Sequence, residues 1–116
     1  MMDLTVDEHL MRAAVIAPKS AIDAFSAPAL RERITSLLDS GVTSLVLDLS
    51  STPFMDSAGM SVLVMALKRA RMAGGNVRLV APKIEAANRI LKLTRFDQVF
   101  EFSASAEEAL AVWRKA

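Results

Sequence analysis

The sequence predicts an α/β protein in which about four helices flank a mixed, mostly parallel sheet of four to five strands. The main observation is that, from Ser26 onward, segments of helical and strand periodicity alternate, beginning and ending with a helix. Such alternation favours parallel strands joined by crossover helices. In addition, 116 residues with 53% hydrophobic and 23% charged side chains are enough to bury one core. We therefore expect residues 1–116 to form a single domain.

Two segments near the N-terminus are predicted to be strands. Residues 4–6 form a short apolar segment, and residues 10–17 form a second one that ends before Pro18. A polar turn at residues 7–9 separates them. We expect these strands to add an antiparallel edge to the sheet.

The first helix is predicted to follow a loop at residues 19–25, which carries Asp23. Ser26 or Ala27 caps this helix and Pro28 suits its first turn. Its core-facing residues are spaced i, i+4, i+7 and i+8: Leu30, Ile34, Leu37 and Leu38. Gly41 is the expected C-terminal stop.

The central stretch, residues 45–60, is a strand followed by a loop and the start of a helix. Leucines alternate with other residues from 45 to 50, the pattern of a strand, and Pro53 ends sheet pairing. Helical spacing begins after Asp56, a favourable N-cap residue, and continues to Met72. Ser57 therefore falls in the first turn, where free N–H groups and the helix dipole favour an anion.

The remaining elements continue the alternation. Gly74 and Gly75 end the central helix, and residues 77–81 form a strand. Pro82 is expected to open the next helix, whose inward residues are Ala87, Ile90, Leu91 and Leu93. Residues 99–102 form the last strand, and residues 105–108 form a capping box before a closing helix with Ala109, Leu110 and Trp113.

Composition and motifs exclude several classes of function. The chain has no Cys, and its net charge is +1 with the basic residues spread along it, so thiol chemistry and a dedicated nucleic-acid surface are not expected. No apolar run reaches the ~18 residues of a membrane span. The N-terminus does not resemble a signal peptide, so we expect a cytoplasmic protein. His9 has no catalytic partner nearby in sequence, and we expect no enzyme activity, cofactor or metal.

The segment Asp56-Ser57-Ala58-Gly59 is the strongest candidate site. It can be explained as an ordinary helix start, with Asp56 as the cap. Three details favour a function: Gly59 weakens the helix but allows close approach of another backbone, apolar residues occupy the preceding loop, and the unit follows the carboxyl end of a central strand. Met55 and Met60 fit either the core or, if exposed beside Ser57, an adaptable contact surface.

These residues resemble the STAS domain of bacterial anti-sigma factor antagonists. The resemblance covers nearly the whole chain and is carried by four segments: residues 22–30, 47–63, 73–80 and 90–97. The Asp-Ser-x-Gly unit is specific only in its strand–loop–helix context, which is present here. One departure is that Ser20 and Ala21 stand where the family usually has a Gly-Glu pair.

The resemblance implies a phosphorylation-controlled binding protein. Such antagonists bind an anti-sigma factor with serine kinase activity, are released when phosphorylated, and are reset by a metal-dependent serine phosphatase. By position, Ser57 is the acceptor and Ser61 a weaker alternative. The implied partner-binding residues are Asp23, Met55, Asp56, Ser57, Ala58, Gly59 and Met60.

Two alternatives remain open from the sequence. The chain could be a STAS signalling module with another partner, such as a transporter subunit. It could also be a small nucleotide-binding protein or enzyme, although it lacks a Gly-rich phosphate loop.

Overall fold

The computed structural model describes residues 12–114, which form four strands and four α-helices with one 3₁₀ turn. The elements in chain order are β1 (Ala13–Ile16), α2 (Ala27–Asp39), β2 (Ser44–Asp48), α3 (Ser57–Met72), β3 (Val77–Val80), α4 (Glu85–Leu93), η1 (Phe96–Gln98), β4 (Glu101–Ser103) and α5 (Ala106–Arg114). This confirms the predicted α/β class and the alternation of helices and strands.

The described strands form one sheet in the order β1-β2-β3-β4, and every neighbouring pair is parallel. The predicted antiparallel edge is therefore wrong for residues 10–17, because β1 runs parallel to β2. The 13-residue helix α2 carries the chain back along the sheet between these strands, as a parallel connection requires. The predicted strand at residues 4–6, the turn at residues 7–9 and His9 lie outside the described residues.

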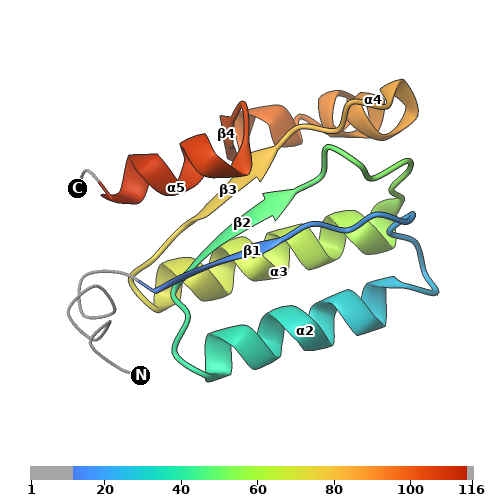
Figure 1. Ribbon diagram of the computed structural model, residues 1–116. Coiled ribbons are helices and arrows are strands. Elements are labelled where there is room, and N and C mark those ends of the chain that lie inside the picture. The colour runs from blue at the N-terminus through green and yellow to red at the C-terminus, as the bar shows by residue number, and fades with distance from the viewer. Residues whose placement is uncertain (1–11, 115–116) are drawn as a thin grey trace.

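Helices cover both faces of the sheet. Figure 1 shows α2 and α3 on one side and α5 on the other. The larger core includes Leu45, Leu47 and Leu49, which alternate along β2 and its end and are fully buried. Val46 points the opposite way, into a smaller cluster with Val80 and Ala109 of α5. Since all strands are parallel, the loops after their carboxyl ends gather at one edge of the sheet.

The central helix α3 has the predicted bounds. It begins after Asp56 and ends at Met72. Gly74 follows with a φ of 87°, and the N–H of Gly75 donates to the carbonyl of Ala70 at 2.9 Å. The glycine pair is thus a C-cap, as the sequence indicated.

Two details of the C-terminal half differ from the prediction. Helix α4 begins at Glu85 rather than at Pro82, because Lys83 donates its N–H to the carbonyl of Ser50 and Ile84 remains extended. Leu93 is 72% exposed, so its inward assignment is wrong. It lies two residues beyond buried Leu91, which turns it to the opposite side of a helix.

The last strand also begins later than predicted. Residues 96–98 form η1, and the N–H groups of Val99 and Phe100 both donate to the carbonyl of Phe96. These turn bonds keep the two residues out of the sheet, so β4 comprises only Glu101–Ser103.

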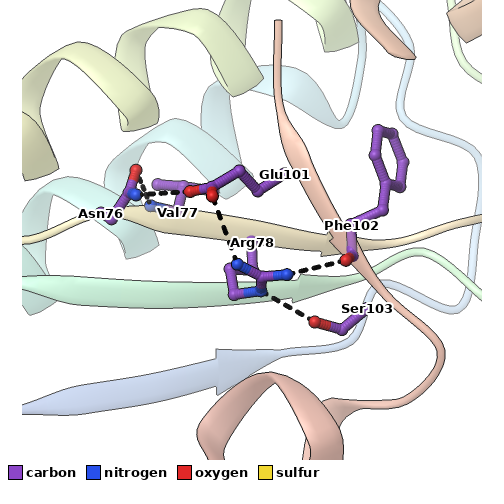
Figure 2. Close-up of polar contacts among 6 residues, drawn as sticks. All are labelled: Asn76, Val77, Arg78, Glu101, Phe102 and Ser103. Carbon is purple, nitrogen blue, oxygen red and sulfur yellow. Dashed lines mark hydrogen bonds and ion pairs between the residues drawn. The ribbon is translucent and has the colours of Figure 1, made fainter. Parts of the chain in front are cut away.

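A network around Arg78 attaches this short strand to β3 (Figure 2). The Arg78 guanidinium donates to the carbonyl of Phe102 and to Oγ of Ser103, both at 2.8 Å. It also lies 3.6 Å from a carboxylate oxygen of Glu101, whose other oxygen accepts from Asn76 at 2.8 Å. The Arg78 side chain is only 15% exposed, so these bonds are partly shielded from water.

No helix within residues 12–114 combines the length and apolar character needed to cross a membrane.

Candidate functional site

The candidate site lies where the loops after β1 and β2 meet at the carboxyl edge of the sheet (Figure 1). Ile22 of the first loop forms an isolated parallel bridge with Met55 of the second. The N–H of Ile22 donates to the carbonyl of Phe54 at 3.0 Å, and the N–H of Asp56 donates to the carbonyl of Ile22 at 3.2 Å. These backbone hydrogen bonds join the Asp23 loop to the loop that leads into the Ser57 helix start.

The Asp56 side chain caps α3. Its Oδ1 accepts hydrogen bonds from the N–H groups of Ala58 at 2.9 Å and Gly59 at 3.2 Å. These bonds satisfy two of the free donors of the first turn. Ser57 is exposed in that turn, and Ala58 is half-buried. The hydroxyl of Ser57 is therefore accessible at the positive end of a 16-residue helix.

Gly59, in the first turn of α3, lies directly against the loop at Ile22. A Cβ atom on this residue would lie 2.6 Å from the carbonyl oxygen of Ile22 and 3.0 Å from its Cγ2 atom. Only glycine permits this separation without movement of the backbone. The sequence-based expectation that Gly59 allows another backbone to approach is confirmed.

Asp23 organises its own loop. Its Oδ1 accepts from the N–H groups of Phe25 at 2.9 Å and Ser26 at 3.1 Å. The N–H groups of Ser26 and Phe25 lower the pKa of Asp23 below its ordinary value of 3.8, because they stabilise the ionised carboxylate. Ser26 is the N-cap of α2 by position, yet its hydroxyl donates to the carbonyl of Ala21 at 2.7 Å and does not cap that helix.

The predicted partner-binding residues differ in exposure. Met55 is 0% exposed and Met60 is 5% exposed, so both belong to the core. The interpretation of an exposed methionine surface is wrong, because Met55 lies at the bridge to Ile22 and Met60 is on the buried side of α3. Gly59 is also buried, whereas Ser57 is exposed and Asp23 and Asp56 are half-buried.

Sequence reasoning did not place two exposed aromatic residues in the site. Phe25, in the first loop, is 95% exposed, and Phe54, in the second loop, is 45% exposed. The available signal was an aromatic side chain in a loop that belongs to no helical or strand pattern. Phe54 is one of the apolar residues of the loop before Asp56, and Phe25 ends the loop at residues 19–25.

A groove of about 860 Å³ extends from these loops between α2 and α3. Its lining includes Ala24, Pro28, Arg31, Ala58 and Ser61. An Arg31 guanidinium nitrogen lies 3.5 Å from Oγ of Ser61, one helical turn beyond Ser57. In the part of the chain that the structure describes, no three Asp, Glu or His side chains are placed to hold a metal ion.

Comparisons with known proteins agree with this architecture. The model of the STAS domain family matches residues 3–109. The chain is 33% identical over 86 residues to the anti-sigma-B factor antagonist of Bacillus subtilis, which covers 74% of this chain and 77% of the relative. It is 29% identical over 108 residues to the anti-sigma-F factor antagonist RsfB of Mycobacterium tuberculosis, with coverage of 92% and 85%.

A solved structure shows the same fold. The crystal structure of TM1081 from Thermotoga maritima superposes with a TM-score of 0.80 at 26% identity and covers 88% of this chain and 87% of that one. The match of the family model over most of the length, together with the fold, shows that the chain belongs to the STAS domain family.

Proposed function

We propose that this protein is an anti-sigma factor antagonist whose binding is controlled by phosphorylation of Ser57. The observation that carries the proposal is the exposed hydroxyl in the first turn of α3, a turn already capped by Asp56. Because the fold does not use this hydroxyl as the cap, it is free for modification. The two relatives described above, which are named as antagonists of anti-sigma factors, support the same function.

In the proposed cycle, the unmodified protein binds an anti-sigma factor with serine kinase activity and thereby frees a sigma factor. The kinase then transfers the γ-phosphoryl group of ATP to Oγ of Ser57. The bond between that phosphorus and ADP breaks, and the hydroxyl proton passes to a base of the kinase. A metal-dependent serine phosphatase hydrolyses the phosphoserine. This cycle uses cytoplasmic ATP and requires no chemistry from the antagonist itself.

The charge of the phosphoryl group explains why the complex would separate while the fold persists. A phosphoserine adds about −1.5 to −2 charges. The N-terminus of α3 stabilises an anion by roughly 0.3–1 kcal/mol, so the modified protein remains folded. In a closely packed interface the same group must lose its hydration next to the carboxylate of Asp56, which is unfavourable.

The test is the intact mass of the protein after incubation with a purified anti-sigma serine kinase and ATP. We expect wild type to gain one phosphoryl group on the peptide that contains Ser57. Ser57→Ala should gain none and should still bind the kinase, whereas Ser57→Asp should fold normally and bind weakly. Ser61→Ala is the matched control, because Ser61 is an exposed serine one turn further along the same helix.

Two results would contradict the proposal. A phosphoryl group on Ser61, or on the Ser57→Ala protein, would show that Ser57 is not the acceptor. Turnover of ATP by the antagonist alone, in the absence of kinase, would indicate an enzyme instead of a binding protein.

A further inference from the structure

Phe25 is the most exposed large hydrophobic residue in the described part of the chain, with 95% of its surface accessible. A single exposed apolar residue needs no special explanation. Phe25, however, lies in a loop that is held in place, next to a second exposed aromatic loop and close to the phosphorylatable turn. We propose that Phe25 is the apolar anchor by which the kinase binds the unphosphorylated protein, an inference that rests on the proposed function.

The loop presents Phe25 in a fixed position. The N–H of Phe25 donates to Oδ1 of Asp23 at 2.9 Å, and the same oxygen accepts from Ser26. The hydroxyl of Ser26 closes the loop by donating to Ala21. The backbone is thus ordered before the partner arrives, which lowers the entropic penalty of binding. Aromatic side chains held in this way are typical centres of binding energy in protein interfaces.

The Phe25 loop lies next to the helix turn that carries Ser57. Ile22, three residues before Phe25, exchanges backbone hydrogen bonds with Phe54 and Asp56. Ala24 lines the same groove as Ala58, the residue after Ser57. A partner that covers Ser57 therefore also reaches the Phe25 loop. A phosphoryl group on Ser57 would bring a dianion into an interface that is otherwise partly apolar, and this would weaken the contact of Phe25.

The occupant of this surface is the kinase and not a second copy of the chain. To transfer a phosphoryl group, the kinase must bring its active site to Oγ of Ser57. The Phe25 loop adjoins that turn through the backbone bonds of Ile22. A kinase that accepts Ser57 in its active site can place an apolar pocket of its own over Phe25.

The experiment measures equilibrium binding, by calorimetry, to the kinase that phosphorylates Ser57 in the mass assay. Phe25→Ala should raise the Kd by about 30-fold, as expected for a central aromatic contact. Phe25→Tyr should remain within about 3-fold of wild type, because the aromatic ring is kept. The melting temperature of both variants should stay close to that of wild type, since the side chain is exposed.

Met72→Ala is the matched control. Met72 is 85% exposed but lies at the opposite end of α3, roughly 22 Å from Ser57 for a helix of this length. This variant should bind like wild type. Equal affinities of the Phe25→Ala and Met72→Ala proteins would overturn the inference, as would a clear fall in the melting temperature of Phe25→Ala.

Other outcomes separate this inference from the proposed function. If wild type neither binds nor is phosphorylated by an anti-sigma kinase, the proposed function fails first. If wild type self-associates in sedimentation and Phe25→Ala does not, the surface is an interface between copies and the kinase assignment is wrong.

Discussion

Gly59→Ala tests whether the loop at Ile22 packs against the first turn of α3 as closely as the structure indicates. In an ordinary helix interior, this change would increase stability by about 1 kcal/mol. Here the new Cβ would lie 2.6 Å from the backbone oxygen of Ile22, which also accepts the hydrogen bond from Asp56. A backbone atom in a bonded loop cannot move aside cheaply, and overpacking of this kind costs about 1–3 kcal/mol.

We therefore expect Gly59→Ala to destabilise the protein by roughly 1–2 kcal/mol, equivalent to a fall in melting temperature of about 4–10 °C for a chain of this size. The assay is thermal unfolding followed by circular dichroism, supported by urea unfolding. Ser61→Ala is the control, because it adds helix propensity at an exposed position of the same helix and should change stability by no more than about 0.5 kcal/mol.

A Gly59→Ala protein as stable as wild type, or more stable, would refute this reasoning. It would mean that the loop at Ile22 does not lie against α3 in solution. The rigid presentation of Phe25 would then lose its support as well, because that loop position depends on the backbone bonds of Ile22.

Two further predictions follow from the hydrogen-bond networks. Arg78→Met should destabilise the fold by about 2–3 kcal/mol in urea unfolding, because it removes a charged donor from several acceptors. Ser103→Ala should cost about 1 kcal/mol, because it removes only one of these acceptors. Equal effects of the two variants would show that the network does not hold β4. Because the pKa of Asp23 is lowered in the folded state, the stability that Asp23 contributes is present above its ordinary value of 3.8 and is lost as the pH falls through the lower folded value. Protection of the Phe25 and Ser26 amides from hydrogen exchange should therefore decrease below that pH in wild type and depend less on pH in Asp23→Asn; an equal response of the two proteins would contradict the role of the carboxylate.

The parts of the fold that could be predicted are those specified by local signals. Helix α3 was placed correctly because its start is a side-chain cap at Asp56 and its end is a glycine cap at Gly74, and both act within a few residues. The position of Ser57 in the first turn of this helix followed from the same local geometry. These features needed no knowledge of which segments meet in space.

The errors concern contacts between distant segments. The direction of β1 depends on its pairing with β2, about 30 residues later, and periodicity carries no information on that pairing. The late start of α4 follows from the bond between Lys83 and Ser50, which joins two loops. Met55 was placed in a loop and therefore considered for the surface, but its bridge to Ile22 puts it in the core.

Asp23 shows how the structure changes a functional expectation. The family resemblance implies only that Asp23 is a partner-binding residue. Its carboxylate bonds to the N–H groups of Phe25 and Ser26, so it determines the conformation of the loop next to Ser57. Loss of kinase binding in Asp23→Ala would therefore be compatible with two causes, a lost charge or a displaced Phe25. Asp23→Asn separates them, because it removes the charge and retains an oxygen acceptor for the loop. If binding survives in Asp23→Asn and is lost in Asp23→Ala, Asp23 acts by positioning Phe25. If both variants lose binding equally while the Phe25 amide stays protected from exchange, the partner recognises the charge itself.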